Sequence, residues 1–125
     1  MDANLRLFSH MVYEYKKGVR RLAMYTCDDH ECRFCVKKLE KSGISYMVTK
    51  ARDGKTNIFF GDCPCISIIE SFGKDRLNEF DAKEDFILGI LLGYDVTKQC
   101  ERYIGLSTPE KCKGCKVPVK KNVSA

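Results

Sequence analysis

The chain has 125 residues, of which 44% are hydrophobic and 31% charged, so it can form one domain with its own core and has an ordinary globular composition. The first residues contain no basic segment followed by an apolar one, and the longest apolar run is about a third of a membrane span. We therefore expect a cytoplasmic protein without a membrane segment.

The formal net charge is +5, and residues 107–125 supply +4 of it through five lysines against one glutamate. The rest of the chain is close to neutral. No aromatic residue lies among these lysines, which argues against a platform for stacking nucleic-acid bases. A basic tail of this kind is more often only solvated and mobile, and where it does bind a partner, an acidic protein fits better than nucleic acid.

Apolar spacing and turn residues predict helices and strands in the order αβαββαα. The first helix carries Leu5, Phe8, Val12 and Tyr15 on one face, with Asp2 as a candidate cap and Gly18 past its end. The remaining elements are a strand over residues 19–26, a helix over 30–42, strands over 44–51 and 56–60, a helix opened by Asp62 and Pro64, and a long helix over 82–103.

This order predicts a single α+β domain over residues 1–106, followed by a basic tail over 107–125. The helix over 30–42 returns the chain, so the first two strands should run parallel. Asp53-Gly54 predicts a type I′ hairpin, which makes the third strand antiparallel to the second. We therefore expect a small, three-stranded mixed sheet with helices packed on it.

Cysteines are the most informative residues of the sequence, because thiolates bind zinc and iron–sulfur clusters and also exchange disulfides. Without a secretion signal, clustered cysteines indicate metal ligands, catalytic thiols or core packing rather than structural disulfides. The eight cysteines are Cys27, Cys32 and Cys35, then Cys63 and Cys65, then Cys100, and finally Cys112 and Cys115.

The spacing of Cys27, Cys32, Cys35 and Cys65 matches that of plant-type [2Fe–2S] ferredoxins. The predicted strand directions argue against such a cluster. They place Cys27 and Cys65 at opposite ends of the sheet, separated by a strand length of about 17–20 Å. We therefore do not expect an iron–sulfur cluster.

The segments Met24-Tyr25-Thr26 and Cys32-Arg33-Phe34-Cys35 resemble the start of glutaredoxins. That resemblance implies a thiol–disulfide oxidoreductase in which Cys32 attacks and Cys35 resolves the mixed disulfide. A helix N-terminus and nearby cations would stabilise the thiolate. The predicted order lacks the second helix and the facing proline of a thioredoxin fold, so the similarity is limited to this segment.

Two other interpretations of the same cysteines stay open. Cys32 and Cys35 share a helix face with Val36 and Leu39, as buried packing residues would. Alternatively, Cys27, Cys32 and Cys35 are zinc ligands, with His30 nearby as a further donor.

The pair Cys112 and Cys115 flanks a Lys-Gly turn, as in a zinc or rubredoxin knuckle. One such knuckle supplies two ligands, and a tetrahedral site needs two more. These could come from Cys32 and Cys35, from Cys100 or from a second chain. The candidate metal ligands are therefore Cys27, Cys32, Cys35, Cys112 and Cys115, and zinc is the candidate metal.

Four segments together resemble a small bacterial family known only as a domain of unknown function. They are residues 13–18 (YEYKKG), 57–62 (NIFFGD), 84–95 (EDFILGILLGYD) and 98–103 (KQCERY). The resemblance spans residues 8–105 and implies a cytosolic α+β protein, often encoded beside flavodoxin. Cys65 and Cys100 match the family pattern better than the first cysteine group does.

These observations favour a non-enzymatic accessory or binding protein in redox or metal handling. Its expected partner is an acidic protein such as flavodoxin, which the basic tail would attract. The alternatives are the glutaredoxin-like oxidoreductase and a small structural zinc protein.

Overall fold

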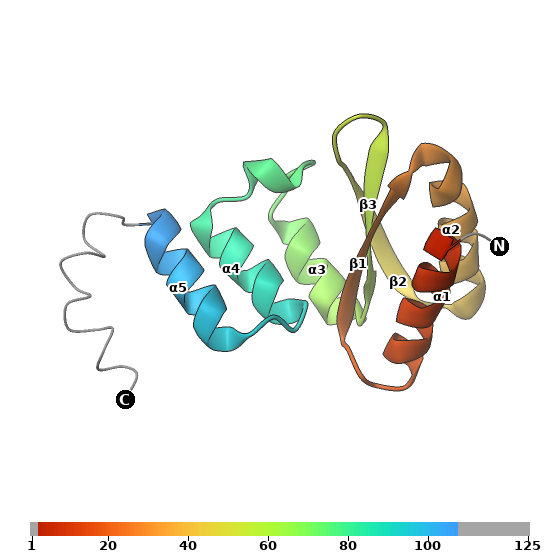
Figure 1. The fold of residues 1–125 in the computed structure, drawn as a ribbon, viewed down its shortest axis with the longest axis horizontal. Helices are drawn as coiled ribbons and strands as arrows, with labels where there is room; N and C mark the ends of the chain where they lie inside the picture. The colour runs from red at the N-terminus through yellow and green to blue at the C-terminus, as the bar shows by residue number, and fades with distance from the viewer. Residues whose placement is uncertain (1–2, 108–125) are drawn as a thin grey trace.

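The computed structural model describes residues 3–107, so the predicted cap Asp2 and most of the basic tail lie outside the described residues (Figure 1). The elements in chain order are α1 (Ala3–Lys16), β1 (Leu22–Asp28), α2 (Asp29–Ser42), β2 (Ser45–Lys50), β3 (Lys55–Gly61), α3 (Cys63–Ser71), the 3₁₀ turn η1 (Leu77–Glu79), α4 (Ala82–Leu91) and α5 (Val96–Ser107). The prediction of a single α+β domain in the order αβαββαα is confirmed, except that the last predicted helix is present as two.

The sheet of the described residues has the order β1-β3-β2. β3 pairs antiparallel with both neighbours, with Met24 and Met47 both opposite Phe59. The predicted mixed sheet is therefore wrong, because the sheet is entirely antiparallel. β1 and β2 do run in the same direction, but the crossover through α2 leaves a gap between them, and β3 fills it.

Within the described residues, buried side chains form two hydrophobic cores, one on each face of the sheet. α1 and α2 cover one face, where Phe8 and Leu39 pack on Ile58 and Phe60. α3 and α4 cover the other face through Ile66, Ile69, Leu88 and Leu92. Figure 1 shows these two groups of helices on opposite sides of the sheet, with α5 lying against α4.

The sequence signals at the ends of the elements are confirmed. The Asp28 carboxylate caps α2 by accepting from the Glu31 N–H at 3.0 Å, and Gly43 ends that helix with φ +70°. In the hairpin, Asp53 and Gly54 have φ of +52° and +72°, as a type I′ turn requires.

The long helix predicted over residues 82–103 is instead two helices that form a hairpin, α4 and α5. The chain reverses at Gly93, where φ is +88°. Asp95 then caps α5, since its carboxylate accepts from the Lys98 N–H at 2.9 Å. A left-handed glycine followed by an Asp cap ends one helix and starts the next. No helix of residues 3–107 has the length and apolar character to cross a membrane.

Candidate functional site

Cys27, Cys32 and Cys35 come together between the end of β1 and the first turns of α2. We call them the thiol cluster. The Cys27 thiol lies close to the thiols of both Cys32 and Cys35. Cys27 and Cys35 are buried in the core with α1 and β3, and Cys32 is half-buried at its edge. The strand-to-helix connection therefore gathers all three residues of the first predicted site.

The environment of the thiol cluster favours the neutral thiol. Burial, reinforced by the neighbouring thiols, raises the pKa of Cys27 to about 11 and that of Cys35 to about 12. Burial and the nearby Asp29 carboxylate also raise the pKa of Cys32. Since the thiolate is the nucleophile in disulfide exchange, these residues are weakly reactive at neutral pH.

The other described cysteines lie away from this cluster. Cys27 is opposite Thr56 at one end of β3, whereas Cys63 and Cys65 follow Gly61 at the other end. The four cysteines with ferredoxin-like spacing are therefore not close together, because Cys65 lies at the opposite end of the sheet from the other three, as the strand directions predict. Cys100 is exposed on α5.

The candidate ligands Cys112 and Cys115 lie outside the described residues. Among residues 3–107, no group of three or more His, Cys, Asp or Glu side chains is arranged to hold a metal ion.

Four exposed cations gather at the end of the sheet where β2 turns into β3. They are Lys50, Arg52, Lys55 and Arg76, and we call this surface the basic pocket. None of the four forms an ion pair with a carboxylate of the described residues, in contrast to Arg20, Lys74 and Arg102. Cations without carboxylate partners are free to attract an external anion.

The basic pocket consists of two adjoining hollows that share Lys50, Arg52 and Arg76 on their rims. The first has a volume of about 310 Å³ and includes Asn57 in its lining. The second has a volume of about 460 Å³ and also includes Asp29 and Asp53. The first hollow therefore has no acidic residue in its lining, whereas the second has two.

The buried polar residue of the first hollow is Asn57, in the central strand. Only 4% of Asn57 is exposed. Its Oδ1 accepts from the Thr26 hydroxyl at 2.6 Å, and its Nδ2 donates to Thr49 Oγ1 at 3.4 Å. Because Thr26 and Thr49 both lie opposite Asn57, these side chains form a polar row across the sheet.

Arg76 reaches the pocket from the loop between α3 and α4. A parallel bridge pairs Arg76 with Lys50, and the Lys50 N–H donates to the Asp75 carbonyl at 3.0 Å. The loop is thereby fastened to the end of β2.

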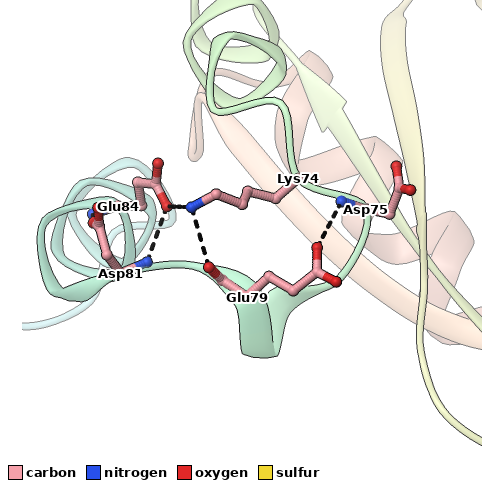
Figure 2. A network of polar contacts seen from close by, with 5 residues as sticks. All are labelled: Lys74, Asp75, Glu79, Asp81 and Glu84. Atoms are coloured by element: carbon pink, nitrogen blue, oxygen red, sulfur yellow. Dashed lines mark hydrogen bonds and ion pairs between the residues drawn. The ribbon is translucent and has the colours of Figure 1, made fainter.

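The same loop is tied to α4 by a polar network (Figure 2). Lys74 Nζ donates to Glu84 Oε1 at 2.6 Å and to the Glu79 carbonyl at 3.1 Å. Glu84 also forms a capping box with Asp81, and Glu79 accepts from the Asp75 N–H at 3.3 Å. The loop that carries Arg76 is therefore held on both sides.

An apolar groove of about 500 Å³ lies between α4 and α5, on the side away from the sheet. Phe86, Ile87, Tyr103 and Ile104 line it together with Lys83 and Cys100. The rings of Phe86 and Tyr103 are in contact, with centroids 5.5 Å apart. Both helices of the hairpin therefore contribute side chains to this groove.

Sequence reasoning placed the positive charge in the tail and missed the basic pocket. Part of the signal was visible, since Lys50, Arg52 and Lys55 surround the predicted Asp53-Gly54 turn. Arg76 had no such signal, because long-range contacts of an irregular loop bring it to the site.

Comparison with known proteins identifies the family of the chain. No curated protein matches the sequence significantly. Residues 6–105 match a family described as "Protein of unknown function (DUF2023)". Since this match covers far more than half of the 125 residues, it confirms the resemblance to a domain-of-unknown-function family, and the chain belongs to the DUF2023 family.

Proposed function

We propose that this protein is a non-enzymatic binding protein that docks an acidic protein partner on the basic pocket. The observation that carries the proposal is the group of four exposed cations without ion-pair partners among the described residues. Flavodoxin is the partner that the family resemblance implies, and its acidic surface complements this charge. The lysines of residues 108–125 add positive charge and would increase the rate of encounter.

The thiol cluster supports a binding function over the glutaredoxin-like alternative. An attacking Cys32 needs a lowered thiol pKa, whereas its pKa is raised, and the resolving Cys35 is fully buried. We therefore expect no turnover of a glutathione mixed disulfide. Turnover that is lost in Cys32→Ser would favour the oxidoreductase instead.

The docking proposal is tested by measuring the affinity for flavodoxin at salt concentrations of about 0.02 and about 0.3 M, which differ strongly in charge screening. We expect a complex at the lower concentration that weakens at the higher one. The double variant Lys50→Glu/Arg52→Glu should weaken it further. The matched control is Arg33→Glu/Lys37→Glu, which reverses two exposed charges on α2.

Two outcomes contradict the proposal. One is the absence of any complex at low salt. The other is an equal loss of affinity in the two double variants, which would mean that net charge alone, rather than this surface, controls binding.

A structural zinc protein is our second proposal, with Cys27, Cys32, Cys35, Cys112 and Cys115 as the ligand pool. It is supported by the proximity of the Cys27 thiol to Cys32 and Cys35. Elemental analysis of protein purified without chelators or oxygen tests it. One zinc per chain that is lost in Cys32→Ser would support this function, and metal-free folded protein would contradict it.

A further inference from the structure

We infer that the hollow over Asn57 is a binding site for a single oxyanion, a carboxylate or a phosphate group. This inference rests on the proposed docking function, because it names the chemical group that the basic pocket would receive. It assigns the hollow over Asn57 as a defined ligand site within the basic pocket.

The side-chain amide of Asn57 has hydrogen-bonding capacity that its neighbours do not fully use. A side-chain amide has two N–H donors on Nδ2 and an acceptor oxygen. The Asn57 oxygen accepts a hydrogen bond from the Thr26 hydroxyl, and Nδ2 donates to Thr49 Oγ1 at the long distance of 3.4 Å. One N–H of this buried amide therefore makes no hydrogen bond to a described residue. A buried donor without an acceptor costs stability, and an oxyanion in the hollow would satisfy it.

Positive charge surrounds the Asn57 amide. Lys50, Arg52 and Arg76 line the same hollow, together with the neutral amide of Asn78, and no carboxylate is part of the lining. Cationic and amide donors around one hollow can form charge-assisted hydrogen bonds with an anion bound in it. The adjoining hollow lacks this character, because Asp29 and Asp53 lie in its lining.

The Asn57 amide and the backbone that carries Lys50 and Arg76 are already held in position. The cross-strand row fixes the Asn57 amide. The bridge to Lys50 and the Lys74–Glu84 ion pair, which Figure 2 shows, fix the loop of Arg76. Binding would therefore require little ordering of the backbone. The volume of about 310 Å³ suits one anionic group or small molecule.

The experiment is a titration of the full-length, ¹⁵N-labelled protein with inorganic phosphate and, separately, with acetate, each at constant ionic strength set with chloride. The Asn57 side-chain NH₂ signals report on the floor of the hollow, and the Lys50 and Arg76 backbone signals report on its rim. We expect saturable shifts of these signals. Saturation by phosphate alone identifies a phosphate site, and saturation by both anions identifies a general oxyanion site. Either result supports the inference.

Two variants test the assignment to this hollow. Asn57→Asp keeps an acceptor for Thr26 but replaces the donor with a charged oxygen, so phosphate affinity should fall at least about tenfold. Arg76→Gln changes an exposed side chain and should also weaken phosphate binding even if Asn57→Asp fails to fold. Lys37→Gln, on α2, is the control with unchanged affinity.

The inference is overturned if the shifts do not saturate or if Arg76→Gln binds phosphate as the wild type does. This outcome is distinct from failure of the docking proposal. A flavodoxin complex without saturable phosphate binding would overturn the oxyanion site alone. Saturable phosphate binding without a flavodoxin complex would overturn only the docking of flavodoxin.

Discussion

The side-chain amide of Gln99 on α5 lies directly against the backbone of Gly89 on α4. Gln99 is a buried polar residue, with its Nε2 at 3.5 Å from the Asp85 carbonyl. A Cβ atom at position 89 would overlap this amide. Since α5 packs mainly on α4, this close approach positions the second helix of the hairpin.

Gly89→Ala should therefore destabilise the protein even though alanine favours helix by about 1 kcal/mol over glycine. We expect a net loss of about 1–2 kcal/mol in the free energy of unfolding, because the overlap displaces Gln99. In a Gln99→Ala background the same change should become stabilising. Urea denaturation of the four proteins of this double-mutant cycle measures the coupling.

Gly105→Ala is the matched control, because a Cβ at that position of α5 meets no atom within 4 Å. It should have the same effect in both backgrounds. Equal effects of Gly89→Ala in the two backgrounds would show that the contact with Gln99 does not limit packing.

The rate of alkylation should differ between buried and exposed cysteines of the described residues. Cys63 and Cys100 are exposed and should react with iodoacetamide rapidly. Cys27 and Cys35 are buried and have raised pKa values, so they should react only when the fold opens. Mass mapping of peptides over time measures each site, and labelling of Cys35 as fast as Cys63 would contradict the structure.

Stability should decrease at alkaline pH because of the same two thiols. Their folded pKa values, about 11 and about 12, lie above the unfolded value of 9.0. Their contribution to the free energy of unfolding is therefore complete below pH 9 and is lost as the pH rises toward their pKa values in the folded protein. Each thiol should lower the free energy of unfolding by about 1.4 kcal/mol per pH unit within its window.

Cys35→Ala removes one of these thiols, so its stability should fall less steeply with pH than that of the wild type. Denaturation between pH 8 and pH 10.5 compares the slopes, and Cys63→Ser, at an exposed position, should match the wild type. Identical slopes for all three proteins would mean that the thiol cluster does not contribute.

Removing the Lys74 ammonium should loosen the loop that carries Arg76. Lys74→Met keeps the apolar stem but removes the ion pair with Glu84 and the hydrogen bond to the Glu79 carbonyl. We expect faster hydrogen exchange at the Lys50 N–H, which donates to Asp75 in this loop. Lys83→Met, at an exposed position of α4 without an ion pair to described residues, should leave that exchange unchanged.

Local features of the fold were predictable because the responsible residues are close in sequence. The Asp28 cap, the Gly43 stop and the Asp53-Gly54 turn each act over a few residues. The break at Gly93 also had a local signal, since Gly93 is followed two residues later by the capping Asp95. The apolar residues on either side of Gly93 nevertheless favoured the prediction of one long helix.

Strand order and pocket geometry were not predictable in this way. The sequence did not show that β3 lies between β1 and β2, because strand order depends on contacts between segments that are far apart in the chain. The proximity of Cys27 to Cys32 and Cys35 followed from their spacing, but the depth of their burial depends on α1. Arg76 is far from Lys50 in the sequence and reaches the pocket only because the Lys74–Glu84 ion pair and the bridge to Lys50 hold its loop there. Such contacts have no local signal in the sequence.

The thiol cluster and the first hollow of the basic pocket, over Asn57, lie on opposite faces at one end of the sheet. Cys27 and Thr26 are neighbours in β1, and consecutive side chains of a strand point to opposite faces. The start of α2 is also fastened to the hairpin, because the Asp29 N–H donates to the Gly54 carbonyl at 3.2 Å and its carboxylate accepts from Thr56. An opening that separates α2 from the hairpin would therefore expose the thiols and disrupt the pocket together.

Thermodynamic linkage follows from that shared opening. A ligand that binds only the closed pocket reduces the open population by the factor one plus its concentration divided by its dissociation constant. The alkylation of Cys35, which proceeds through the open form, slows by the same factor. The rate at which Cys35 is alkylated on one face of the sheet therefore measures how much ligand is bound in the pocket on the other face.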